Sequence, residues 1–208
     1  MKTILCFGDS NTYGERPDGG GRYERGERWT GRLQSALGGE YLIVEEGLNG
    51  RTTVWSDPVE GDKCGIKHLP TCLESHAPLD LVILMLGTND LKVRFCATPT
   101  DISLGAEALV RLVLFAQNGR REQPPKVLLA APTFLQRQTF LGEVFGDRHE
   151  DSLRLGSLYA DVARRNGVEF INIAEYAQPS TLDGLHFDSE NHAKVAAAFE
   201  RKIRQILL

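Results

Sequence analysis

The chain has 208 residues, of which 41% are hydrophobic and 25% charged, and its formal net charge is −4. The size fits one domain over residues 1–208, and the composition is that of a globular protein, which excludes a disordered chain. Charges of both signs are interspersed without a basic stripe, and no apolar run approaches the roughly 20 residues that cross a bilayer, so we expect neither nucleic acid nor a membrane as a partner.

Five apolar runs predict the strands of a buried sheet. They are residues 3–7, 41–44, 81–86, 127–131 and 168–173. Most are apolar on both faces, which is typical of a parallel sheet that is covered on both sides. The first run is short, lacks a small-residue cleavage site and is soon followed by charges, so we interpret it as a strand and not as a secretory signal. We therefore expect a cytoplasmic protein.

Helical patterns alternate with these runs, over residues 28–37, 102–117, 151–166 and 190–207. The alternation predicts a three-layer α/β/α sandwich around a five-stranded parallel sheet. Two segments interrupt it: the glycine- and charge-rich residues 14–27, and the long irregular stretch 133–151. Loops of this length usually serve a site or are mobile, and the sequence leaves their roles open.

The cysteines do not predict a disulfide framework or a metal centre. Cys6, Cys64, Cys72 and Cys96 form no C-x-x-C pair, so we expect free thiols that pack as small hydrophobic groups. The spacing of Cys64, His68, Cys72 and His76 suits one face of a helix better than a zinc site. We expect no metal.

Polar residues follow the predicted strands at the edge where open α/β sheets bind ligands. The strand ends are followed by Gly-Asp-Ser-Asn at 8–11, by residues 45–52, by Gly-Thr-Asn-Asp at 87–90 and by residues 131–133, and Asp-Gly-Leu-His at 183–186 comes before the last helix. Because these stretches are far apart in the chain, their convergence on one edge is a stronger signal than any one of them.

Ser10 has two interpretations. It is a favoured helix N-cap, whose hydroxyl would accept a backbone N–H. As a nucleophile it would need a base, and His186 is the best candidate because Asp183, on the same turn, can accept its Nδ1–H and leave Nε2 free. His149 and His192 belong to no strand-end cluster, so we expect them to be solvated.

Three groups are candidates for an oxyanion hole: the backbone N–H groups of Ser10 and Gly50 and the side-chain amide of Asn89. Attack on an ester carbonyl places negative charge on its oxygen, and donors must already point there. Turn chemistry explains Gly50 and Asn89 singly, but it does not explain all these groups in this order.

The order resembles a known family. Gly8-Asp9-Ser10, Gly50, Gly87-x-Asn89-Asp90 and Asp183-x-x-His186 look like the four blocks of the SGNH hydrolases, also called GDSL esterases and lipases. The stretches ILCFGDS, RWTG, EEGLNGRTT, DLVILMLGTND and DGLHF further resemble the bacterial arylesterase and acyltransferase branch. One departure is Asn11, where the first block usually has leucine.

The resemblance implies a flavodoxin-like fold and a serine esterase. Ser10 would be the nucleophile, His186 the base and Asp183 its orienting acid, with Ser10, Gly50 and Asn89 forming the oxyanion hole. It also implies no metal or organic cofactor, a small ester such as an acetate as substrate, possible acyl transfer to alcohols, and a homo-oligomer.

Aromatic residues near the predicted mouth are candidates for a substrate pocket that accepts short acyl groups. They are Tyr13, Trp55, Phe134, Phe140 and Phe145. Packing within the molecule or at an oligomer contact explains each of them equally well.

Two rival functions remain. In a flavodoxin-like phosphate- or nucleotide-binding protein without hydrolase activity, the loop after the first strand would hold a phosphate at a helix N-terminus. That reading gives no role to Asn89, Asp183 or His186, and neither G-x-x-x-x-G-K-[ST] nor G-x-G-x-x-G occurs. The second rival is a catalytically silent assembly protein that keeps the fold.

Overall fold

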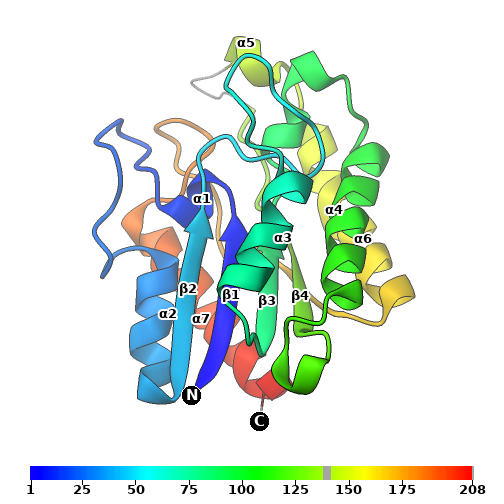
Figure 1. The fold of residues 1–208 in the computed structure, drawn as a ribbon. Helices are drawn as coiled ribbons and strands as arrows, with labels where there is room; N and C mark the ends of the chain where they lie inside the picture. The colour runs from blue at the N-terminus through cyan, green and yellow to red at the C-terminus, as the bar shows by residue number, and fades with distance from the viewer. Residues whose placement is uncertain (138–141, 208) are drawn as a thin grey trace.

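The computed structural model describes residues 1–137 and 142–207. Its strands are β1 (Lys2–Gly8), β2 (Tyr41–Gly47), β3 (Leu81–Met85), β4 (Lys126–Ala131) and β5 (Glu169–Asn172). They pair in parallel in the order β2-β1-β3-β4-β5 (Figure 1). The predicted five-stranded parallel sheet is therefore confirmed, with β2 running on to Gly47 rather than ending at Val44.

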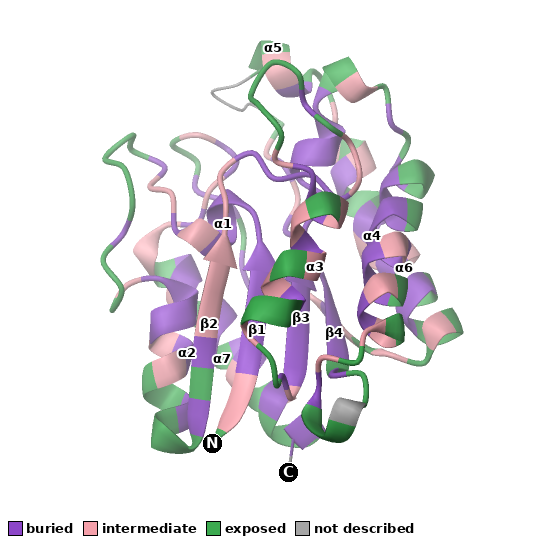
Figure 2. Ribbon diagram, viewed as in Figure 1, coloured by how far each residue is buried: buried purple, intermediate pink, exposed green. Residues whose placement is uncertain are grey.

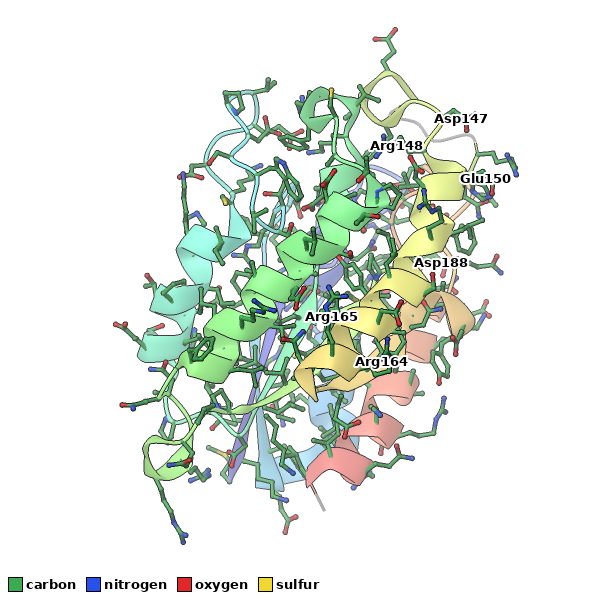
Figure 3. The ribbon with its side chains drawn as sticks, turned by 90° about the vertical axis from the view of Figure 1, so that its right-hand side faces the viewer. Asp147, Arg148, Glu150, Arg164, Arg165 and Asp188 are labelled. Carbon is green, nitrogen blue, oxygen red and sulfur yellow. The ribbon has the colours of Figure 1, made fainter. Side chains whose placement is uncertain are left out.

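Helices cover both faces of the sheet (Figure 1). One face carries α2 (Trp29–Leu37) and α7 (Ser189–Leu207), and the other carries α3 (Gly65–Ser75), α4 (Pro99–Phe115) and α6 (His149–Asn166), of which α4 and α6 lie side by side (Figure 3). Shorter elements are α1 (Ser10–Tyr13), α5 (Gly142–Phe145), η1 (Gly38–Glu40), η2 (Asn89–Leu91), η3 (Val93–Phe95), η4 (Arg120–Glu122) and η5 (Ile173–Glu175). The three-layer prediction is confirmed.

The sheet separates two hydrophobic cores, visible as buried strands between half-buried helices (Figure 2). Alternation along β1 sends Leu5 and Phe7 toward the α3, α4 and α6 side, and Ile4 and Cys6 toward the α2 and α7 side. On the latter side Trp29 stacks on Phe199 with ring centroids 4.6 Å apart.

Within the described ranges, no helix combines the length and the apolar character that a membrane span requires. A capping box fixes the start of α4. Thr98 Oγ1 accepts the Asp101 N–H at 3.2 Å, and the Asp101 carboxylate accepts the Thr98 N–H at 2.9 Å. This reciprocal pair starts α4 at Pro99, earlier than the hydrophobic pattern predicts.

The carboxyl ends of the strands gather at one edge of the sheet, at the top of Figure 1, together with α1 and the long loops. The end of α1 lies directly against the end of β2. A Cβ on Gly47 would stand 2.1 Å from the Tyr13 backbone nitrogen, so only glycine allows this close approach. The fold thus brings the ends of β1 and β2 to the same small region.

Candidate active site

The turn after β1 presents Ser10 at the start of α1. Asp9, not Ser10, is the N-cap: Asp9 Oδ1 accepts the Asn11 N–H at 3.0 Å. The hydroxyl of Ser10 is therefore free of capping, and its Oγ lies 3.0 Å from His186 Nε2. Of the two interpretations of Ser10, the structure excludes the N-cap.

His186 is held by a tight turn that begins at Asp183. Asp183 Oδ1 accepts the backbone N–H groups of Leu185 and His186 at 2.9 and 3.0 Å, while Oδ2 lies 2.6 Å from His186 Nδ1. The carboxylate fixes the proton on Nδ1, so Nε2 accepts from the Ser10 hydroxyl. The structure thus brings Ser10, His186 and Asp183 into one hydrogen-bonded chain.

Asn11 ties the serine turn to the histidine turn. Its Oδ1 accepts the Phe187 N–H at 3.0 Å, and its Nδ2 donates to the Leu185 carbonyl at 3.3 Å. The two partners flank His186. Asn11 stands where the family pattern usually has leucine, and its amide makes two hydrogen bonds beside the site.

The candidate oxyanion donors and the serine line one cleft. Asn89 Nδ2 donates to the Arg51 carbonyl at 3.1 Å, which uses one of its two hydrogens. Gly50 has φ +80°, a conformation that favours glycine, and among the described residues neither its N–H nor that of Ser10 has a hydrogen-bond acceptor. Unpaired donors beside a hydroxyl are what a developing oxyanion requires.

Two buried carboxyl groups support these loops. Burial raises the pKa of Asp9 to about 6, opposed by the Asn11 N–H and by the charges of His186 and Arg51. Burial also raises the pKa of Asp90 to about 7, opposed chiefly by hydrogen bonds from Thr53, whose backbone N–H lies 2.9 Å from Asp90 Oδ1. Both acids accept backbone N–H groups and so anchor the turns that carry Ser10 and Asn89.

The cleft over Ser10 has a volume of about 220 Å³. Ser10, Gly50, Asn89 and His186 all line it, so four of the five predicted catalytic and oxyanion residues reach one hollow, with Asp183 behind His186. The sequence does not predict the other residues that line the cleft, which besides Phe145 are Glu15, Asn49, Glu60, Lys92, Val144 and Leu185. They lie in loops or in the short α5, where the directions of side chains depend on tertiary packing.

One wall of the cleft is charged. Lys92 is only 4% exposed, and its Nζ lies 2.6 Å from Glu60 Oε1. Arg94 Nη2 also lies 2.6 Å from that oxygen. The charge on Glu60 is thus compensated at the rim, and this wall is polar rather than the aromatic lining that the sequence predicts.

Of the predicted aromatic residues that the structure describes, only Phe145 lines this cleft. Trp55 packs over Gly105 of α4 in a separate hollow, Phe134 lines another beside Tyr176, and Tyr13 lies under the Arg22 guanidinium, 4.3 Å from its ring centroid. Phe140 lies outside the described residues. The prediction of a pocket lined by these aromatics is corrected accordingly.

The prediction for His192 is also wrong, because this side chain is fully buried. Its Nδ1 accepts the Trp29 N–H at 3.3 Å, and its ring meets Tyr23 and Phe187 edge to face. Burial lowers the pKa of His192 to about 3, so it stays neutral. His149 is half-buried, with Nδ1 2.5 Å from the Leu135 carbonyl oxygen.

The described part of the chain contains no cluster of three or more histidine, cysteine or acidic side chains arranged to hold a metal ion. Cys64, His68, Cys72 and His76 lie on or next to α3, the helix that their spacing predicts.

Comparisons with known proteins agree with this geometry. The profile of the GDSL-like lipase/acylhydrolase family matches residues 6–194, a span that includes Ser10, Gly50, Asn89, Asp183 and His186. The chain belongs to this family. A comparison with curated proteins gives no match.

Solved structures of GDSL-like hydrolases are similar over the full chain. The aryl esterase of M. smegmatis is 38% identical, with a TM-score of 0.93 and 100% of both chains covered. A carbohydrate acetylesterase from Sinorhizobium meliloti is also 38% identical, with a TM-score of 0.95 and the same coverage. The fold is thus that of the SGNH hydrolases, and this GDSL-like protein is a carboxylic ester hydrolase, as its sequence predicts.

Proposed function

We propose that this GDSL-like hydrolase is a serine esterase that cleaves small carboxylic esters through an acyl-enzyme on Ser10. The observation that carries the proposal is the continuous chain from Ser10 Oγ to His186 Nε2 at 3.0 Å and from His186 Nδ1 to Asp183 at 2.6 Å. It opens into a cleft that also holds Asn89 and Gly50.

In the first half-reaction, His186 Nε2 takes the proton of Ser10 as Oγ attacks the ester carbonyl carbon. The carbonyl oxygen becomes negative and is stabilised by the Ser10 and Gly50 N–H groups and by Asn89 Nδ2. Asp183 stabilises the imidazolium. The ester C–O bond then breaks, and the alcohol leaves with the proton from His186.

In the second half-reaction, water enters the place of the alcohol and gives a proton to His186 as it attacks the acyl carbon. The Ser10 ester bond breaks, and the serine recovers its proton from His186. A second alcohol can replace water, in which case the product is a new ester. We include this acyl transfer in the proposal because both nucleophiles use the same base.

The volume of the cleft favours short acyl groups. At about 220 Å³, with Glu60 and Lys92 in its wall, it offers little apolar space to a long chain. We therefore expect acetates to be cleaved faster than decanoates of the same alcohol. A p-nitrophenyl ester series from two to ten carbons measures this, and a rate maximum at eight carbons or longer would contradict it.

Replacement of Ser10 is the direct test. We expect Ser10→Ala to abolish turnover of p-nitrophenyl acetate and labelling by a fluorophosphonate, while the wild type takes up the probe at Ser10. Ser103→Ala, at a buried serine of α4, is the matched control and should keep both activities. Normal turnover by Ser10→Ala, or wild-type protein that neither hydrolyses esters nor takes up the probe, overturns the proposal.

Asn89 is a second test, at the oxyanion. Loss of one donor costs about 3 kcal/mol of transition-state stabilisation, so Asn89→Ala should lower kcat roughly 100-fold with a smaller effect on KM. Steady-state kinetics on p-nitrophenyl acetate measure both constants. A change confined to KM would mean that Asn89 binds the substrate without stabilising the oxyanion.

The homo-oligomer that the resemblance implies stays a prediction, as does the cytoplasmic location inferred from the first apolar run. Light scattering of the purified protein checks the first, and cell fractionation checks the second.

A further inference from the structure

Arg51 is a buried cation that has no part in the proposed mechanism. It directly follows Gly50 in the chain, yet it is only 4% exposed and does not line the cleft over Ser10. Charged side chains are seldom buried to this extent unless they are paired or hydrogen-bonded. The contacts of its guanidinium and of its backbone therefore indicate its role.

The side chain of Arg51 holds the ends of two strands. Its Nη1 donates to the carbonyl of Gly8, the last residue of β1, at 3.0 Å, and also to the carbonyl of Glu46 near the end of β2. The guanidinium carbon lies 4.0 Å from the centroid of the Phe7 ring, which adds a cation–π contact. Because Gly8 is two residues before Ser10, Arg51 fixes the backbone from which the serine turn begins.

The backbone of Arg51 reaches the other two oxyanion donors. Its N–H donates to the Leu48 carbonyl at 3.1 Å and closes a four-residue turn in which Gly50 is the third residue, with φ +80°. Its carbonyl accepts from Asn89 Nδ2 at 3.1 Å. Arg51 is thus bonded covalently to one donor, Gly50, and hydrogen-bonded to another, Asn89.

The guanidinium strengthens the junction between this turn and β1. The Leu48 N–H also donates to the Gly8 carbonyl, at 3.2 Å, so that oxygen accepts one neutral and one charged donor. Hydrogen bonds from an ionised donor are the stronger kind, and an arginine stays protonated in proteins. Substitution of Arg51 removes the charged contact and keeps the backbone one.

We propose that Arg51 is the positioning residue of the oxyanion hole: its guanidinium holds the turns of Gly50 and Ser10 in register, and its carbonyl orients the Asn89 amide. Arg51 acts through these donors and does not itself contact the substrate. The inference rests on the proposed esterase function and adds to it a residue that aligns all three donors. Small displacements of such donors cost rate because the oxyanion forms at one point in space.

Two substitutions of Arg51 test the proposal. Arg51→Met keeps an unbranched side chain and removes the donors, so kcat for p-nitrophenyl acetate should fall about 10- to 100-fold while KM changes less than about 3-fold. Arg51→Lys keeps the charge on a side chain one atom shorter than the path to Nη1, and should lower kcat only about 3- to 10-fold. A wild-type kcat in Arg51→Met, or a loss confined to KM, overturns the inference.

Arg165→Met is the matched control. Arg165 also makes a charged hydrogen bond to a buried acceptor, Glu107, at the contact between α4 and α6. Its loss should lower the urea midpoint and leave kcat and KM unchanged. If Arg165→Met lowers kcat as much as Arg51→Met does, the effect is a general one of lost stability, and Arg51 is not a positioning residue.

A double variant locates the effect at the oxyanion. If Arg51 acts through the donors, the loss of kcat in Arg51→Met/Asn89→Ala should be at least about 3-fold smaller than the product of the two single losses. Independent losses, which multiply, overturn the inference. If Arg51→Met does not fold, Arg51→Lys and its double variant with Asn89→Ala are judged by the same criterion.

The two proposals fail in different ways. If the wild type hydrolyses no ester and Ser10 takes up no fluorophosphonate, the proposed function fails. If the wild type is active and labelled but the Arg51 variants keep kcat, or their losses multiply with that of Asn89→Ala, only the role of Arg51 fails.

Discussion

At the scale of single residues, the distance between the Ser10 and His186 side chains depends on hydrogen bonds between Asn11 and the two residues that flank His186. The two residues are 176 positions apart in sequence, yet their side chains must stay within hydrogen-bond distance. Asn11, next to Ser10, holds the backbone on both sides of His186. A shift of either turn would therefore be resisted by hydrogen bonds that do not take part in the chemistry.

We predict that Asn11→Leu lowers kcat about 10-fold with little change in KM, because His186 loses its fixed position while the cleft stays open. Leucine keeps the branched shape of the side chain but leaves the buried Phe187 N–H without an acceptor, which costs about 1–3 kcal/mol of folding free energy. Steady-state kinetics and urea denaturation measure the two effects.

The control for this variant is Asn166→Leu, which removes amide hydrogen bonds at the end of α6, to the Val162 carbonyl and to Glu107. It should lose stability and keep kcat. A normal kcat in Asn11→Leu would mean that the Ser10–His186 geometry is maintained without the amide.

The sequence predicts Ser10, Asn89, Asp183 and His186 as one group because each lies beyond the end of a buried run, where a parallel sheet collects side chains. It does not predict that Asp9 takes over the capping, since both residues are good caps. It also fails for His192 and for Tyr13, Trp55 and Phe134. Their surroundings come from distant segments, such as the loop that brings Tyr23 over His192.

At the scale of elements, the loops after β2 and β3 are joined through a buried acid. Asp90 accepts the backbone N–H and the hydroxyl of Thr53 and is fully buried. Its pKa is about 7 in the folded protein, against an ordinary value of 3.8. Asp90 thus joins the loop that carries Gly50 to the turn that carries Asn89, in a buried environment that disfavours the ionised carboxylate.

The raised pKa predicts how stability depends on pH. Below the ordinary value Asp90 is protonated in both states, and as the pH rises from about 4 to about 7 the unfolded chain releases this proton first. The free energy of unfolding therefore falls across this window, by up to about 1.4 kcal/mol per pH unit. Asp90→Asn, which carries no charge, should gain stability relative to the wild type as the pH rises from 5 to 8.

Urea denaturation of both proteins at pH 5, 6, 7 and 8 checks this prediction. Asp147→Asn removes an exposed carboxylate in the loop before α6 (Figure 3) and is the control. Parallel curves for Asp90→Asn and the wild type would show that Asp90 ionises at the same pH in the folded and unfolded states.

At the contact between α4 and α6, a buried acid has a lowered pKa, in contrast to Asp90. Glu107 of α4 is almost fully buried, with Arg165 Nη2 at 2.5 Å and Asn166 Nδ2 at 3.0 Å, and Figure 3 shows Arg165 where α6 borders α4. The hydrogen bond from Arg165 lowers the pKa of Glu107 to about 2. The stabilisation is therefore complete above the ordinary value of 4.5 and is lost as the pH falls toward 2.

We predict that Glu107→Gln lowers the free energy of unfolding at pH 7 by about 2 kcal/mol without changing kcat/KM, because the hydrogen bond from Arg165 then reaches a buried neutral amide in place of a buried carboxylate. Glu150→Gln is the control: Glu150 and Arg137 are 68% and 66% exposed, and such pairs contribute about 0–1 kcal/mol. Equal losses in the two variants would contradict the role of burial.

The long periodic helices could be predicted from sequence, since α2, α4, α6 and α7 all lie within a few residues of their expected ranges. The short elements could not. α5 has only four residues, too few for a hydrophobic period, and it lies inside the stretch 133–151 that reads as irregular. Its packing nevertheless places Phe145 in the cleft.

At the scale of the whole molecule, the sheet divides the apolar interior into two cores that share only the strands. Ile102 lies in the core under α4, and Ile203 lies in the core under α7. We predict that Ile102→Val and Ile203→Val each cost about 1 kcal/mol. Their sum should hold in the double variant within about 0.5 kcal/mol, because the sites share no partner.

Urea denaturation followed by fluorescence and by circular dichroism measures all three variants. One coincident transition is expected for residues 1–208, since both cores need the same five strands. Two separate transitions would mean that the two cores unfold independently of each other. A coupling above about 1 kcal/mol between the isoleucines would mean that packing in one core depends on packing in the other.

β1 is an interior strand of the sheet and is synthesised before the other four, and the imidazole that meets Ser10 is encoded 176 positions after that serine. A ribosome that halts before that point releases a chain with the hydroxyl and no base. On the proposed mechanism such a fragment is inert, so ester cleavage reports that translation has passed residue 186. Supplying the missing C-terminal piece in trans would make the same reaction a readout of fragment association.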